Sequence, residues 1–204
     1  MTMLFQLAYS PNERDLPTMF DYSSFPIVET ERLILRRMTE EDAPAILAEF
    51  GDPRVLEHLD PNPPVTDIES ARSFLHWLMG MFDEKQALRW AITLRTDGTM
   101  IGTCGFHRWD EKHRRAEIGY DLQAAYWRQG YASEATRAMM AFCFKELNLH
   151  RLEADCNEGN KGSAAVLEKC GFTYEGLWRH RFFENGQWIN LKQYSILEDE
   201  YAAL

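Results

Sequence analysis

One stretch, a strand that runs into a helix across a single glycine, limits the folds open to this chain. Residues 116–122 (AEIGYDL) read as a strand, and a helix follows from Gly130 to about Leu147, because apolar side chains recur along one of its faces. Residues 150–157 (HRLEADCN) read as the next strand. Two strands joined through a crossing helix run parallel. The sequence therefore predicts a mixed α/β sheet with a parallel step at its centre.

Antiparallel elements surround that unit. On its N-terminal side we expect a strand over 32–38, a helix from Thr39 to near Gly51, a helix after Pro63-Pro64 capped by Thr66 or Asp67, and strands 88–95 and 99–106 joined by Asp97-Gly98. On its C-terminal side, a helix over 161–170 stops at Gly171, and a β-hairpin turns at Asn185-Gly186. The predicted fold class is α/β (α+β), with a sheet of about six to seven strands and about four helices. We expect residues 1–28 to form an irregular N-terminal arm and residues 29–204 to form one domain.

Charge and composition narrow the function. The chain has 32 acidic and 22 Lys and Arg residues, a net charge of -10, which argues against nucleic acid or an anionic membrane as a partner and suits a cationic substrate such as an amine. Its four cysteines show no metal-binding spacing and fall mostly in apolar segments, so we expect reduced, buried thiols and a cytoplasmic protein. Six histidines without an HxxxH or HxH pattern predict no metal site.

The loop over residues 127–133 is a candidate anion site. A helix start leaves backbone N–H groups unpaired, Gly130 and Ala132 allow a close approach, and Ser133 adds a hydroxyl. No GxGxxG or P-loop lysine accompanies it, so a dinucleotide or a triphosphate is not favoured. Taken alone, an ordinary helix start explains the loop equally well.

A second segment adds a family resemblance. Residues 156–176, CNEGNKGSAAVLEKCGFTYEG, resemble the NxxNxxSxxVxEKxGFxxEG pattern of RimJ/RimL-like acetyltransferases of the GNAT superfamily, and AEIGY with WRQGYASEA resembles the acetyl-CoA-binding strand and loop of that superfamily. The resemblance covers roughly residues 29–200 and implies the GNAT fold, with acetyl-CoA as cosubstrate. Its CoA diphosphate would lie on the amides around the loop and its pantetheine arm between two splayed parallel strands. The cofactor-binding residues implied are Leu122, Arg128, Gln129, Gly130, Tyr131, Ala132, Ser133 and Asn160.

Two departures from the family pattern matter here. Trp127 stands where Gln or Arg is usual, and we expect little effect on phosphate binding because the loop acts through its backbone. Leu167 occupies the position of a tyrosine that often protonates the leaving thiolate. Arg128, Arg137, Lys161 and Lys169 are candidate cations for CoA, or simply solvated charges on helix faces.

The resemblance also suggests catalytic residues. Glu117 matches a general base of some relatives, and its alternative role is an ion pair with Arg114 or Arg115. Ser163 is the candidate donor to the leaving thiolate, and its alternative role, like that of Asn160, is to cap a helix. Further candidate bases are His107 and, as a weak substitute, Glu184. In the family, a backbone N–H beyond a bulge in the strand that here ends near residues 120–122 is expected to polarise the thioester carbonyl.

The function implied is N-acetylation of a primary amine by direct transfer, with the N-terminal α-amine of a protein, of the ribosomal-protein type, as the first choice of acceptor. A polyamine, amino sugar or antibiotic is the alternative acceptor, and a non-catalytic acyl-CoA-binding module is the alternative class. We expect a monomer or a homodimer.

Overall fold

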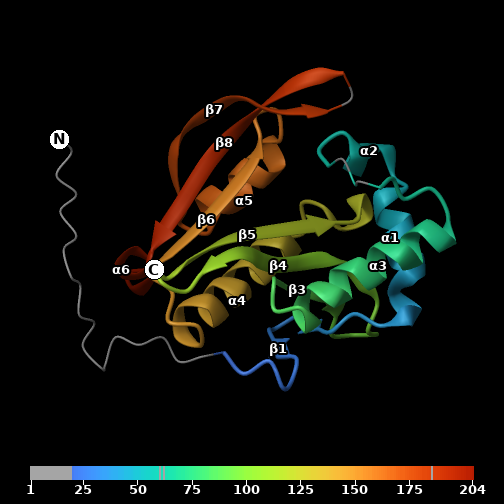
Figure 1. The fold of residues 1–204 in the computed structure, drawn as a ribbon, viewed down its shortest axis with the longest axis horizontal. Coiled ribbons are helices and arrows are strands. Elements are labelled where there is room, and N and C mark those ends of the chain that lie inside the picture. Colours follow the sequence, from blue (N-terminus) through green and yellow to red (C-terminus); the bar gives the residue numbers. More distant parts are fainter. Residues whose placement is uncertain (1–19, 60, 62, 185) are drawn as a thin grey trace, which may run out of the picture.

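The computed structural model describes residues 20–59, 61, 63–184 and 186–204, and its centre is an eight-stranded sheet in the order β1-β2-β3-β4-β5-β6-β8-β7 (Figure 1). The strands are β1 (Val28–Glu29), β2 (Leu33–Arg36), β3 (Leu88–Leu94), β4 (Met100–Asp110), β5 (Arg115–Leu122), β6 (Arg151–Asn157), β7 (Thr173–Glu184) and β8 (Gln187–Leu197). β5 and β6 pair in parallel, and the other neighbouring strands pair antiparallel. The predicted mixed sheet with its central parallel step is confirmed.

Helices cover the sheet on both faces. They are α1 (Ala43–Phe50), α2 (Pro53–Leu56), α3 (Ile68–Asp83), α4 (Tyr131–Lys145), α5 (Lys161–Lys169) and α6 (Glu198–Ala202), with 3-10 turns η1 (Glu40–Asp42) and η2 (Ala124–Tyr126). α1 and α3 pack together over β3 and β4, whereas α4 and α5 lie against the opposite face (Figure 1). Each layer has its own apolar core: Ile46 and Leu75 belong to the first, and Met139 and Leu167 to the second. The helices therefore hold the central strands from both sides.

Local sequence explains where the main helices begin and end. The Asp67 side chain accepts a hydrogen bond from the N–H of Ser70 at 2.8 Å and caps α3, as predicted. Gly130, with a φ of +84°, is the residue before α4, and Gly171, with a φ of +91°, follows α5. The short helices α2 and α6 were not predicted, because segments of four and five residues are too short to display helical periodicity.

The chain before β1 packs onto the domain where it is described. The ring of Phe25 lies 4.8 Å from that of Phe82, and the indole N–H of Trp90 donates to the carbonyl of Pro26 at 2.8 Å. Residues 1–19, most of the predicted arm, and Asn185 of the predicted hairpin turn lie outside the described residues. Glu184 pairs with Gln187, which agrees with a hairpin turn at this place. Within the described ranges, no helix is long and apolar enough to cross a membrane.

Candidate active site

A cleft opens where the two parallel strands separate. β5 and β6 pair from Arg115 to Glu117 and from Arg151 to Glu153, and no pairing continues beyond these residues. Residues 118–122 and 154–157 then line the two walls of a cleft of about 1020 Å³. Strand edges that no longer pair with each other expose backbone N–H and C=O groups. The cleft therefore offers hydrogen bonds to an extended ligand along its length.

The first turn of α4 closes one end of this cleft. Its first intrahelical hydrogen bond runs from the N–H of Glu134 to the carbonyl of Gly130 at 3.0 Å, so the N–H groups of residues 131–133 have no partner within the helix. Gly130 supplies no side-chain cap. The guanidinium of Arg32 bonds the carbonyl of Gln129 at 3.0 Å and lies 4.5 Å from the ring centre of Tyr131. Arg32 is also paired with Glu134 of the same turn at 2.6 Å, so the unpaired amides are the feature here that suits an anionic group.

Most of the predicted cofactor residues meet in the cleft. Its lining includes Leu122, Arg128, Gly130, Tyr131, Ala132, Ser133 and Asn160. Gln129 is not part of the lining, because its side-chain amide donates to the carbonyl of Ala125 at 2.9 Å. Among the candidate cations, Arg128, Lys161 and Lys169 line the cleft, whereas Arg137 donates to the carbonyl of Lys169 at 3.2 Å.

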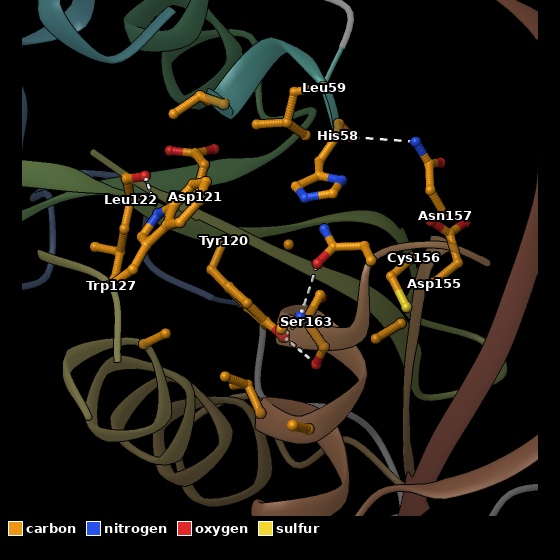
Figure 2. A pocket seen from close by; sticks show the side chains of 18 of the residues that line it. His58, Leu59, Tyr120, Asp121, Leu122, Trp127, Asp155, Cys156, Asn157 and Ser163 are labelled. Atoms are coloured by element: carbon orange, nitrogen blue, oxygen red, sulfur yellow. Dashed lines mark hydrogen bonds between the residues drawn. The ribbon is translucent and has the colours of Figure 1, made fainter. Parts of the chain in front are cut away.

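Trp127 has a structural role that sequence reasoning missed. Its indole N–H donates to the carbonyl of Leu122 at 2.7 Å and so ties the loop to the end of β5 (Figure 2). A bulge is expected in the strand that ends near residues 120–122, and the irregularity in its pairing lies at the beginning of the strand. The β4–β5 register is continuous from Leu122 to Glu117 and shifts between His107 and Asp110 instead.

Glu117 lies on β5 at the point where the strands separate, with its side chain mostly buried. One carboxylate oxygen lies 3.1 Å from Nε2 of His107, and the other accepts from Arg108 at 2.6 Å. Arg114 and Arg115, the pairing partners considered from the sequence, bond elsewhere. Burial alone would raise the pKa of Glu117, but the hydrogen bond from His107 and the charges of His107 and Arg108 outweigh it, so its pKa is lowered.

Asp155 is the acidic residue that sequence reasoning missed. It lies on β6 and faces the cleft, as Figure 2 shows. Burial raises the pKa of Asp155, and the negative charge of Glu117 raises it further. The alternation of residues 151–157 could have placed Asp155 on the same face as Glu153, but only the pairing of β6 with β5 brings it to Glu117. Two carboxyl groups thus lie close together in this part of the cleft, and Glu117 is paired with Arg108 and His107.

Ser163 faces Tyr120 across the cleft. The Tyr120 hydroxyl lies 2.9 Å from the Ser163 hydroxyl and 3.0 Å from its carbonyl oxygen, and Figure 2 shows the two side chains directed toward each other. Asn160 caps α5 by accepting from the N–H of Ser163 at 2.9 Å. Burial raises the pKa of Tyr120. Leu167 is fully buried in the core, whereas Tyr120 and Ser163 both line the cleft.

The segment after α2 forms another wall. His58 and Leu59 line the cleft, and the side-chain amide of Asn157 donates to the carbonyl of His58 at 3.2 Å (Figure 2). Phe182 of β7 also lines it. The side chain of Glu184, the weak candidate base, lies outside the described residues. Asp52 caps α2 and Pro53 opens its first turn, a start signal that sequence reasoning read as the end of the preceding helix; the approach of α2 to β6 has no signal in the sequence.

The four cysteines are buried and free. Burial raises the pKa of each thiol, to about 12 for Cys104. Protonated thiols are weak nucleophiles, so the interpretation of these residues as structural fits their surroundings. Among the residues that the structure describes, no three His, Cys, Asp or Glu side chains are grouped to hold a metal ion.

A buried carboxyl pair borders the cleft on the side of α1. Asp121 accepts from the N–H of Thr103 at 3.0 Å and pairs with Arg89. Glu49 of α1 has a relative exposure of 0%, and neither of its carboxyl oxygens has a hydrogen-bond partner in the described part of the chain. Burial, and then the charge of Asp121, raises the pKa of Glu49 well above its ordinary value. The buried Glu49 carboxyl therefore lies next to Asp121, which is held by Arg89 and Thr103.

Sequence comparison connects this geometry to known proteins. A family model described as an acetyltransferase (GNAT) domain matches residues 32–173. "Uncharacterized N-acetyltransferase YoaA" of Bacillus subtilis (strain 168) is 39% identical over 179 residues, which cover 85% of this chain and 98% of that protein. "Putative ribosomal N-acetyltransferase YdaF" of the same strain is 35% identical and covers 52% of this chain and 57% of its own. Spermidine N(1)-acetyltransferase of Escherichia coli (strain K12) is 32% identical, with 55% and 60% covered.

Solved structures share the fold. A GNAT-family acetyltransferase from Bacillus anthracis superposes with a TM-score of 0.75 at 28% identity, over 85% of this chain and 99% of that chain. The ribosomal L7/L12 α-N-protein acetyltransferase RimL, solved in complex with coenzyme A, gives a TM-score of 0.77 at 24% identity, over 86% and 99%. The RimL likeness supports the arrangement of sheet and helices alone.

Proposed function

The chain is an N-acetyltransferase of the GNAT family, and we propose that it transfers the acetyl group of acetyl-CoA directly to the N-terminal α-amine of a protein of ribosomal type. The observation that carries this proposal is the separation of β5 and β6, which leads to the unpaired N–H groups of residues 131–133. Acetyl-CoA would supply the acetyl group as a thioester. A C–N bond forms to the amine, the C–S bond breaks, the amine loses a proton, and the thiolate gains one.

Binding would rest on the main chain and on nearby cations. The amides of residues 131–133 would hold the diphosphate, with Arg128, Lys161 and Lys169 beside it. The unpaired strand edges would form hydrogen bonds with the amide groups of the pantetheine arm, and Asn160 would contact the arm from the side of α5. Holding both substrates in the reactive orientation can lower the activation barrier by on the order of 7–11 kcal/mol.

Glu117 would accept the proton of the amine, directly or through a water molecule. Its lowered pKa keeps it ionised at neutral pH, and an ionised carboxylate attracts the ammonium form of the acceptor. His107, 3.1 Å away, can take part in passing the proton onward. Asp155 lies on the same side of the cleft and offers a second carboxyl group to an amine acceptor.

Ser163 would donate a hydrogen bond to the sulfur as the C–S bond breaks. Tyr120, with its hydroxyl at 2.9 Å, can donate to Ser163 and leave the serine proton free to point at the sulfur. Stabilising charge that develops only in the transition state raises the rate more than it raises substrate affinity.

Two acceptor classes remain to be separated. Support for a ribosomal protein N-terminus comes from the similarity to YdaF and from the earlier resemblance to RimL-like sequences. The similarity to spermidine N(1)-acetyltransferase and the carboxyl groups of Glu117 and Asp155 favour a polyamine as the second candidate.

The deciding experiment offers the protein acetyl-CoA with peptides that begin with Ala, Ser or Thr, or with spermidine, and follows thiol release with mass confirmation of the product. Glu117→Gln should lower kcat about 10²-fold or more, with CoA affinity unchanged. Glu146→Gln, an exposed change at the end of α4, is the matched control and should have wild-type kcat. Binding of CoA without acetylation of any amine would reject the proposed acetyl transfer and support an acyl-CoA-binding module.

A further inference from the structure

A second, smaller cavity lies beside the acidic part of the cleft. It has a volume of about 310 Å³, and its lining includes Arg115, Arg151, Glu153, Glu175, Trp178 and Gln193. Gln193 of β8 pairs with Asp155 of β6, and Arg115 lies two positions before Glu117 on β5. Paired residues, and residues two apart on a strand, point to the same face of a sheet. This cavity is therefore adjacent to the two carboxylates of the cleft.

The Nε2 atom of the Gln193 side chain has no hydrogen-bond partner in the part of the chain that the structure describes. Gln193 is 8% exposed, and this Nε2 atom is buried. Leaving a buried donor unpaired costs free energy, and such a donor is normally satisfied by protein, water or ligand. The position therefore favours a guest with a hydrogen-bond acceptor.

Arg115 adds further donors, whereas the other charged groups of the cavity are engaged. Arg151 bonds Glu153 at 2.8 Å and Glu175 at 2.6 and 2.9 Å. The guanidinium of Arg115 lies 3.6 Å from Glu153 and 3.8 Å from Asp110, too far for a strong hydrogen bond. The groups with spare capacity are thus the donors of Arg115 and Gln193.

We propose that this cavity binds backbone carbonyl oxygens of a peptide acceptor through Gln193 and Arg115, while the amine of the same peptide lies against Glu117 and Asp155. This inference rests on the proposed acetylation of an amine in the cleft. It assigns Gln193 as a specificity-determining residue that favours a peptide over a polyamine, since a polyamine carries ammonium groups and no carbonyl.

The dimensions of sheet and peptide agree with this assignment. Neighbouring strands lie about 4.8 Å apart, and an extended peptide advances about 3.3 Å per residue. A peptide whose amine contacts Asp155 thus brings the carbonyl of its first or second residue over Gln193, one strand away. A polyamine in this cavity would place a cation or a methylene group beside the amide N–H groups.

The test compares acceptor preference in wild type and in Gln193→Glu, which keeps the side-chain shape but replaces the donor with an acceptor. KM is measured for an amidated hexapeptide beginning with Ser and for spermidine, with CoA affinity and Tm as controls. The peptide KM should rise about tenfold or more, the spermidine KM should stay equal or fall, and CoA affinity should not change. Gln187→Glu makes the same charge change at an exposed position of β8 and should leave both KM values unchanged.

Gln193→Met guards against a folding defect, because it removes the donor without adding charge and should also raise the peptide KM alone. Peptide and spermidine KM values that shift by the same factor, or not at all, overturn the peptide subsite while leaving acetylation itself intact. A wild-type enzyme that acetylates spermidine but no peptide overturns both this subsite and the proposed protein acceptor. A protein that acetylates no amine rejects the proposed function and this inference with it.

Discussion

Replacing Gly130 with alanine tests whether the main chain at the start of α4 holds the cosubstrate. Gly130 has a φ of +84°, and an added Cβ would lie 3.3 Å from Nη2 of Arg32. The end of the Arg32 side chain can move aside, but left-handed backbone costs an L residue about 1–2 kcal/mol. In the free variant the loop can relax and relieve this strain, whereas binding would restore it. Affinity for CoA should therefore fall by about 5- to 30-fold, at 1.4 kcal/mol per factor of ten.

Calorimetric titration with CoA measures the change in affinity, and thermal unfolding measures the change in stability separately. Gly98→Ala is the matched control, because Gly98 has a φ of +76°, lies in the turn between β3 and β4, and has no described atom within 4 Å of an added Cβ. It should lose about 2–8 °C of Tm and no CoA affinity. Wild-type CoA affinity in Gly130→Ala would refute the reasoning that these amides bind the diphosphate.

Three further variants test other parts of the structure. Tyr120→Phe should lower kcat with CoA affinity unchanged, because the phenol positions the Ser163 hydroxyl, and an unaltered kcat would remove Tyr120 from the mechanism. Glu49→Gln should raise Tm at pH 7–8. The pKa of Glu49 is higher in the folded protein than the value of 4.5 in the unfolded chain, so the wild type loses stability as the pH rises from 4.5 toward the folded-state pKa. That Tm difference should shrink as pH falls to about 4.5 and below, where both states are protonated, and a pH-independent difference in unfolding scans would contradict it. Trp127→Phe removes the hydrogen bond of 2.7 Å to Leu122 and should lower the free energy of unfolding, measured with denaturant, by about 0.5–1.5 kcal/mol. An unchanged free energy of unfolding would show that this bond does not stabilise the loop.

Local signals in the sequence predicted the framework of the candidate site. The turn at Gly130 and the cap at Asn160 each depend on a few neighbouring residues, and both are present where the sequence indicated. The predicted mixed sheet followed from the order of strands and helices, although the number of strands was only approximate. Elements of this kind are readable because their causes lie within one turn of chain.

Residues brought together by pairing between distant strands were not predictable in the same way. Asp155 meets Glu117 only because β6 lies beside β5, and Gln193 meets Asp155 only because β8 returns next to β6. Their positions depend on register, and a shift by one residue would turn each side chain to the other face. His58 reaches the cleft through α2, a helix of four residues that carries no periodicity.

The short parallel contact between β5 and β6 has a mechanical consequence. Three residue pairs, 115–117 against 151–153, together with the hydrogen bonds that the carbonyl of Arg114 accepts from His150 and Arg151, link the five strands on one side to the three on the other. A molecule wedged beyond this link and bonded to both exposed edges acts as a clamp across the sheet. Amide protons of β5 and β6 should therefore exchange with solvent more slowly when a ligand occupies the cleft. The sheet should be most rigid in the complex with both substrates.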